Sequence, residues 1–247
     1  MKGRQGMKMN AKTILAVLAA ALPAAALAAG EESAAGTGMT WAEILERGGV
    51  LMYVLGALSV VGLALIVYYT MVLRVKSVAP EAQILRLREL LKERRGEDAR
   101  AECAKNPTAL ASVTALGLDF LKENPAASAG ALKEIMESEG GRQAGRMQNM
   151  IHYLLDLSSV APMVGLLGTV LGMLRAFNSV ALDVAAARPQ ALAEGVGQAL
   201  VTTVAGLVVA IPALIAWAIF RGRVGKLVGR LEVATAELMS LMDNRGA

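Results

Sequence analysis

Three long runs without a charged residue limit what this chain can fold into. Val50–Leu73 is a run of 24 residues, Leu157–Leu174 one of 18 and Val196–Phe220 one of 25. At about 1.5 Å per helical residue, each run reaches or approaches the ~30 Å of hydrocarbon in a bilayer. The chain is 55% hydrophobic and 19% charged, whereas soluble domains are about 45–50% apolar and about 25% charged. The sequence therefore predicts an all-α membrane protein with three transmembrane helices.

A fourth apolar run, Ile14–Ala29, has a different character. It follows four basic residues, is rich in alanine and ends in Ala26-Leu27-Ala28. This layout is typical of a secretory signal peptide with a small-residue cleavage site. We therefore expect residues 1–28 to be a signal peptide. An uncleaved short anchor is the alternative.

The flanking charges predict the orientation of the helices. Arg74 and Lys76 follow the first run, and four basic residues follow the third between Arg221 and Arg230, whereas residues 31–49 before the first run and the short loop 183–195 before the third are net acidic. Lysine and arginine collect on the cytoplasmic side of a membrane. We therefore expect a periplasmic N-terminus and a cytoplasmic C-terminus. The predicted segments are a periplasmic stretch 29–49, a first span 50–73, a cytoplasmic insert 74–150, a second helix 151–182, a periplasmic loop 183–195, a third span 196–220 and a cytoplasmic helix 221–247.

The cytoplasmic insert is expected to be helical as well. Residues 74–150 carry 13 basic and 11 acidic residues among many leucines and alanines, and Asn106-Pro107 and Asn124-Pro125 predict turns between short helices. From about Lys133 to Asp156 the sequence has no strong helix breaker except Gly140-Gly141, so we expect the second transmembrane helix to start well inside the cytoplasm. The residues after Arg221 show apolar positions at helical spacing. The sequence thus predicts long cytoplasmic helical extensions.

Composition argues against an enzyme, a metal centre and a nucleic-acid binder. The chain has one cysteine, Cys103, and one histidine, His152. We find no nucleophile motif, no phosphate-binding glycine loop and no carboxylate pair in a plausible pocket, so no cofactor or metal is expected. The net charge of +4 follows from the predicted membrane topology and does not imply a nucleic-acid partner.

The second and third runs contain small and polar residues that lipid does not require. On a helix, the second run aligns Gly165, Thr169, Gly172 and Ala176, and the third aligns Ala199, Thr203, Gly206 and Ala210, with Gln198 and Thr202 on an adjoining face. Small residues let membrane helices pack closely, so these stripes are packing seams in one interpretation, with the threonines bonded to their own backbone. In the other, the polar groups face a water-filled path. Pro162 and Pro212 each remove a backbone hydrogen bond, which frees a carbonyl or simply kinks the helix.

At these residues the chain resembles a known family. The segments "VAPMVGLLGTVLGMLRAFNSVA" and "GVGQALVTTVAGLVVAIPALI" look like the paired signature helices of the MotA/TolQ/ExbB proton-channel family, and are most similar to its ExbB and TolQ branches. The order of the segments also matches that family: one helix, a large cytoplasmic insert, then two helices joined by a short outer loop. The resemblance covers roughly residues 47 to 240.

The resemblance implies an inner-membrane homopentamer around a pore. The pore would hold the helices of a single-span partner of the ExbD or TolR type, whose aspartate carries the proton, and a TonB-like protein is a further implied partner. Thr169 and Thr203 would line the pore, with Thr202 and Gln198 also on the ion pathway. The implied packing and kink positions are Pro162, Pro212, Gly165, Gly168, Gly172 and Gly206.

One position departs from the family pattern. ExbB and TolQ commonly carry a glutamate five residues before the pore threonine, and this chain has Gln198 there. Glutamine forms hydrogen bonds but does not titrate near neutral pH. Glu194, one turn earlier, is the candidate acid at the outer mouth, and Arg175 is expected at the membrane interface or paired with an acid.

A TolQ-like role in envelope maintenance and a non-conducting membrane scaffold remain alternatives, and the coupling ion, proton or sodium, stays open.

Overall fold

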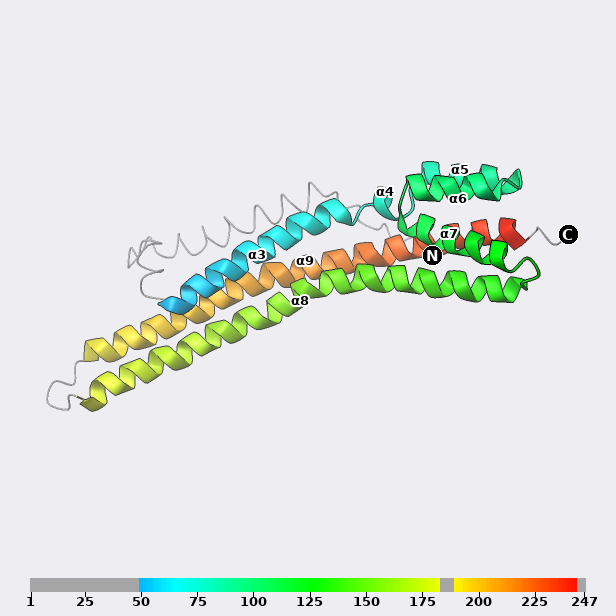
Figure 1. Cartoon of the computed structure of the whole chain (residues 1–247). Coiled ribbons are helices and arrows are strands. Elements are labelled where there is room, and N and C mark those ends of the chain that lie inside the picture. The colour runs from blue at the N-terminus through cyan, green and yellow to red at the C-terminus, as the bar shows by residue number, and fades with distance from the viewer. Residues whose placement is uncertain (1–48, 183–188, 244–247) are drawn as a thin grey trace, which may run out of the picture. The chain divides into compact units, whose positions relative to one another are not determined.

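The computed structural model describes residues 49–182 and 189–243, and every regular element in these ranges is a helix. The elements are α3 (Val50–Val72), α4 (Val75–Val78), α5 (Glu81–Lys92), α6 (Gly96–Lys105), α7 (Ala109–Glu123), α8 (Ala129–Leu182) and α9 (Pro189–Asp243) (Figure 1). Helices α3, α8 and α9 are long and apolar enough to cross a membrane. The predicted all-α fold with three spans is thereby confirmed. The predicted signal peptide, 1–28, and the predicted periplasmic stretch 29–49 except Gly49 lie outside the described residues, as do residues 183–188 of the predicted periplasmic loop, whereas its residues from Pro189 onward belong to α9.

The chain divides into two compact units. The apolar unit contains the described residues up to Ile66 together with Leu154–Ile215, and the polar unit contains Val67–Tyr153 and the residues from Ala216 onward. Within its described residues the apolar unit holds three charged side chains, those of Asp156, Arg175 and Glu194, and all three are exposed. This composition is what a segment within a bilayer requires, because a charge at mid-membrane depth is costly.

Helices α8 and α9 are unusually long because their prolines and glycines do not end them. Helix α8 has 54 residues and α9 has 55, with Pro162 inside the first and Pro212 inside the second. The run Gly140-Gly141 also lies within α8 without a break. In membrane helices the backbone group that a proline frees is satisfied by neighbouring helices or local adjustment, so an internal proline is tolerated.

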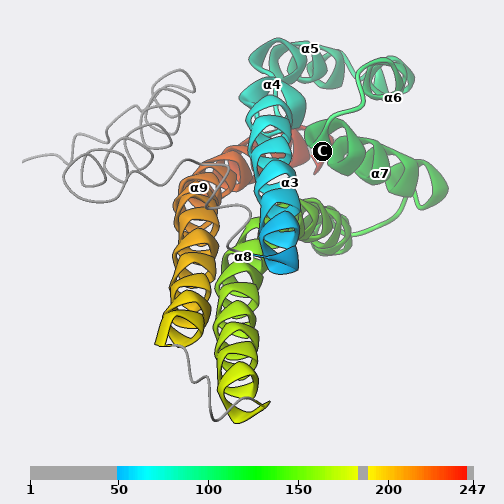
Figure 2. The same ribbon diagram turned by 90° about the vertical axis from the view of Figure 1, so that its left-hand side faces the viewer.

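In the apolar unit α3 packs lightly on the other two helices. Leu55 is buried with Ala161 of α8 and Ala210 of α9, and Gly62 lies against the side chain of Leu157. Figure 2 shows α3 running beside α8 and α9. Most of the other large side chains of α3 are exposed, as are many on α8 and α9. Exposed aliphatic side chains over a whole helix suit lipid contact rather than water.

In the polar unit a partly buried polar contact joins α5 to the turn between α6 and α7. The Thr108 hydroxyl caps α7 by accepting from the Ala111 N–H at 3.1 Å, and it donates to Oε1 of Gln83 at 2.7 Å. Gln83, which is buried on α5, donates through Nε2 to the carbonyl of Asn106 at 2.8 Å. Because buried polar groups must be hydrogen-bonded, this contact ties α5 to the turn between α6 and α7.

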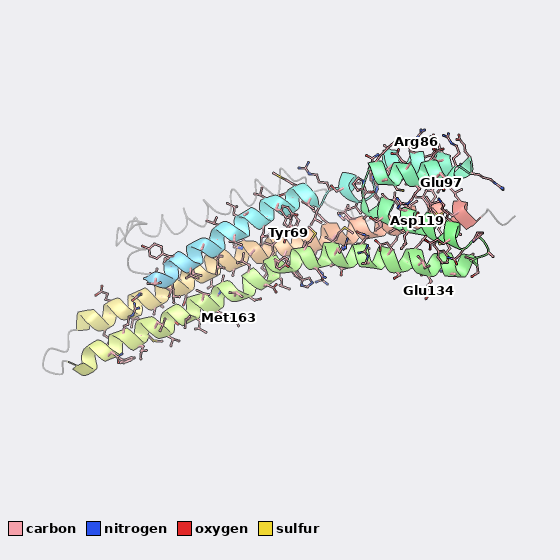
Figure 3. The ribbon with its side chains drawn as sticks, in the orientation of Figure 1. Tyr69, Arg86, Glu97, Asp119, Glu134 and Met163 are labelled. Atoms are coloured by element: carbon pink, nitrogen blue, oxygen red, sulfur yellow. The ribbon has the colours of Figure 1, made fainter. Side chains whose placement is uncertain are left out.

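Ion pairs on the surface of the polar unit join the same helices. Lys122 of α7 contacts Glu97 of α6 at 2.7 Å, and Arg100 contacts Asp119 at 2.8 Å (Figure 3). Two further pairs, Arg88–Glu237 and Arg230–Glu81, connect α5 to α9. All these side chains are substantially exposed, so each pair contributes only about 0.2–1 kcal/mol and serves mainly to orient the helices.

Candidate functional site

The glycines of α8 bring its backbone into direct contact with α9 in the apolar unit. A Cβ atom added at Gly165 would lie 2.9 Å from the carbonyl oxygen of Thr202, and one at Gly172 would lie 3.0 Å from the carbonyl oxygen of Gly195. At Gly168 an added Cβ would collide with the side chain of Thr202. A side chain at any of these positions would push the two helices apart.

Helix α9 contributes glycines to the same contact. A Cβ added at Gly206 would lie 2.7 Å from the carbonyl oxygen of Ala161, and Gly195 sits against the methyl group of Ala176. Lipid is as apolar as leucine and gives no hydrophobic drive for helix association, so close packing of small residues supplies the attraction. We call this contact the α8–α9 seam.

The seam runs along positions spaced by three or four residues. Its buried positions are Ala161, Gly165, Gly168, Gly172 and Ala176 on α8, and Gly195, Ala199, Thr202, Gly206 and Ala210 on α9. The sequence pattern placed Thr169 and Thr203 in these stripes, but in the structure Gly168 and Thr202 occupy the buried places. Thr169 and Thr203 lie beside the seam and are half-buried.

Each threonine hydroxyl in this region donates to a carbonyl of its own helix. Thr169 donates to Leu166 at 2.6 Å and Thr203 to Ala199 at 3.4 Å. Thr202, only 1% exposed, donates to the same Ala199 carbonyl at 2.9 Å. Among the described residues none of these hydroxyls bonds to another helix, yet each oxygen keeps lone pairs that can accept a hydrogen bond. The threonines therefore bond to their own helix, which was one of the two interpretations of the sequence. At Thr169 and Thr203 the hydroxyl oxygen stays accessible, because both side chains are only half-buried.

Gln198 lies where the start of α3 meets α9. Gly49 precedes α3 with φ of +65°, and a Cβ added there would lie 2.6 Å from Nε2 of Gln198 and 3.8 Å from Nη1 of Arg175. The left-handed backbone and the lack of space both favour glycine at this position. Within the described ranges Arg175 forms no ion pair, and neither does the exposed Glu194. No local sequence pattern indicates this contact, because Gly49 and Gln198 are far apart along the chain.

The cysteine of the chain is buried and its histidine is exposed. Burial raises the pKa of the Cys103 thiol to about 11, so that it is neutral at physiological pH, and a neutral thiol is a poor nucleophile. His152 is exposed. The part of the chain that the structure describes contains no group of three or more potential metal-ligating side chains.

Comparison with known proteins shows the family to which helices α8 and α9 belong. The family model described as "MotA/TolQ/ExbB proton channel family" matches residues 105–233, which include the whole α8–α9 seam. The chain belongs to the MotA/TolQ/ExbB family. The expected family, drawn from the two glycine-rich helices, is confirmed.

Three relatives illustrate the range of this similarity. "Biopolymer transport protein exbB1" of Vibrio cholerae is 32% identical over 47% of this chain and 55% of the relative. "Tol-Pal system protein TolQ" of Pseudomonas aeruginosa is 33% identical over 42% of this chain and 45% of the relative. A "Putative biopolymer transport protein ExbB homolog" of Methanothermobacter thermautotrophicus is 27% identical over 83% and 69%. The chain thus spans about half the length of the first two.

A solved structure described as "Structure of C. jejuni MotAB" shares the fold. It superposes with a TM-score of 0.58, covering 96% of this chain and 90% of that chain at 16% sequence identity. At this identity the likeness concerns the fold alone.

The seam predicts a sharp difference between two glycine substitutions in α9. Gly206→Ala places a methyl group 2.7 Å from a backbone oxygen of α8, which cannot rotate away. Overpacking of this kind costs about 1–3 kcal/mol, so we expect a lower melting temperature when the detergent-solubilised protein is heated and followed by size-exclusion chromatography.

Gly197→Ala is the matched control, because a Cβ there meets nothing within 4 Å. Alanine in a helix interior is favoured over glycine by about 0.5–1 kcal/mol, so this variant should melt at the same temperature or higher. Equal melting temperatures for the two variants would contradict the seam.

Proposed function

We propose that the chain is an inner-membrane ion-channel subunit of the ExbB type. With an ExbD-like single-span partner, it would use the ion motive force, carried by protons, to energise transport across the cell envelope. The observation that carries the proposal is the position of Thr169 and Thr203, half-buried beside a tightly packed seam in an almost uncharged unit. Polar groups at membrane depth tend to face a bundle interior or a water-filled path.

The distribution of acids supports the need for a partner. In the described residues of the apolar unit the carboxylates are Asp156 and Glu194, and both are exposed. Asp156 precedes the uncharged run that begins at Leu157, and Glu194 precedes the one that begins at Val196. A proton relay needs a titratable group within the membrane, and neither of these lies inside a run. The proton-carrying carboxyl group would therefore come from the partner's helix.

The residues of the site receive different roles in this proposal. Thr169 and Thr203 would line the pore and hydrogen-bond the partner's carboxyl group. Thr202 would pack the seam, since it is fully buried against Gly168. Gln198 would hold the start of α3 through its contact at Gly49 and would not carry a proton, because an amide does not titrate.

Five copies of the chain would surround the pore, with the N-terminus periplasmic and the C-terminus cytoplasmic. This orientation is favoured by the basic residues Arg74 and Lys76 after α3 and by the four basic residues of α9 between Arg221 and Arg230. The exposed faces of α8 and α9 beside the seam are the surfaces that neighbouring copies and the partner would cover. A TonB-like protein would transmit the work of the motor to transport across the cell envelope.

Two alternatives have specific support. The relatives include TolQ as well as ExbB proteins, so a TolQ-like motor for envelope maintenance fits the same geometry. Gln198, in place of the glutamate that the family commonly has, motivates a non-conducting scaffold. Co-reconstitution with an ExbD- or TolR-like single-span partner separates the classes, since ion flux into vesicles is expected for a motor subunit and absent for a scaffold.

Replacing either pore threonine by valine tests the proposed site. Valine matches threonine in shape but removes the hydroxyl, and an unsatisfied partner group costs about 1–3 kcal/mol. Because about 1.4 kcal/mol is tenfold in an equilibrium constant, we expect Thr169→Val and Thr203→Val to reduce ion flux about tenfold or more. Both should still assemble and bind the partner, as measured by co-purification.

Val201→Thr adds a hydroxyl on a different face of α9 and should leave flux unchanged. If both valine variants conduct like the wild type, Thr169 and Thr203 only bond their own helices and the pore assignment fails.

The proposed stoichiometry is tested separately. We expect native mass spectrometry of the chain released from detergent to show a homopentamer, because the half-buried faces of α8 and α9 need neighbours. A stable monomer or dimer under the same conditions would contradict this assembly.

A further inference from the structure

A group of basic side chains in the polar unit has no acidic counterpart. Residues 67–80 and 216–231 contain six lysines and arginines and no aspartate or glutamate. Of these, Arg230 pairs with Glu81. The basic patch consists of Arg74, Arg221, Arg223 and Lys226, which form no ion pair within the described residues.

An aromatic contact brings the two parts of the basic patch to the same level. The ring of Tyr69, near the end of α3, packs edge-on against Phe220 of α9 with centroids 5.9 Å apart (Figure 3). Arg74 follows Tyr69 by five residues, and Arg221 and Arg223 directly follow Phe220. The basic residues therefore begin on both helices where the apolar part of α3 ends.

The three guanidinium groups are held in place by the protein. Arg221 lies over the ring of Trp217, 5.3 Å from its centroid, and Arg223 lies over Phe220 at 5.6 Å. Nε of Arg74 donates to the carbonyl of Thr70 at 3.3 Å. Such contacts fix the orientation of each planar group while its terminal nitrogens stay available. A pre-oriented guanidinium suits bidentate binding of a phosphate.

Exposed apolar side chains adjoin the basic patch. Tyr68 is 52% exposed, Met71 60% and Val75 43%, on the final turn of α3 and on α4. A soluble phosphate would use the cations only and would leave this apolar surface uncovered. A lipid would cover both, because its acyl chains continue from its phosphate into the bilayer that α3 crosses.

We propose that the basic patch binds the phosphate of an anionic phospholipid headgroup, with the acyl chains along the exposed side chains at the end of α3. Arg74 and Arg221 are its principal ligands, since both are exposed and orientated, and Lys226 adds charge. The inference rests on insertion into a membrane and does not depend on ion conduction.

Native mass spectrometry of the detergent-purified protein, titrated with phosphatidylglycerol or phosphatidylcholine, tests the proposal. Each cation near a membrane surface strengthens binding of anionic lipid by about fivefold. The double variant Arg74→Gln/Arg221→Gln should therefore bind phosphatidylglycerol at least about tenfold more weakly than the wild type. Phosphatidylcholine should bind weakly to both.

Two further variants make the result specific. Arg94→Gln/Arg146→Gln removes the same charge from exposed arginines that form no ion pair with any described residue, and should bind phosphatidylglycerol like the wild type. Arg221→Lys keeps the charge, and thus the membrane orientation, but loses the planar fork, so binding should weaken several-fold.

Three results would overturn the proposal. Equal weakening in both double variants would mean that only the overall charge matters. Unchanged binding in Arg221→Lys would mean diffuse attraction without a site. Displacement of the lipid by soluble glycerol 3-phosphate at equal concentration would mean that the patch binds free anions and gains nothing from the acyl chains.

Discussion

The contact of the α8 backbone with the α9 backbone is the interaction on which the rest of the membrane part depends. Glycine or alanine occupies nearly every buried position, and at Gly165, Gly172 and Gly206 only glycine fits, because a Cβ there would lie 2.7–3.0 Å from a carbonyl oxygen of the other helix. Lipid gives no hydrophobic reward for bringing helices together, so this close packing is the main attraction available. The seam therefore holds α8 and α9 together within the apolar unit as one paired element.

The same packing explains where the polar groups lie. The seam buries positions that are three or four residues apart, so it cannot bury all three threonines. Thr202 lies in the seam, and Thr169 and Thr203 lie half-buried beside it. Bonds to their own helices satisfy their donors and leave their oxygens able to accept. Because the described acids of this unit lie outside the uncharged runs, the role proposed for those oxygens requires a titratable group from another chain.

The sequence predicts the spans well and the contacts between them less well. Uncharged runs identify α3, α8 and α9 because the cost of burying charge in lipid acts on each segment by itself. The glycines predict a close approach, but the choice between Gly168 and Thr169, or between Thr202 and Thr203, depends on how the two helices face each other. The contacts of Gly49 with Gln198 and of Gln83 with Thr108 join distant segments and have no local pattern.

Thiol modification in the assembled protein tests most directly whether Thr203 faces a water-filled path while Thr202 does not. The native Cys103 is buried, with a pKa of about 11. It should therefore not react with a charged methanethiosulfonate reagent, which modifies thiolates that are exposed to water. The account predicts that Thr203→Cys reacts from the aqueous phase, that Thr202→Cys does not, and that the single-span partner protects position 203. Reaction at position 202 with none at position 203, or reaction at 203 that the partner leaves unchanged, would contradict it.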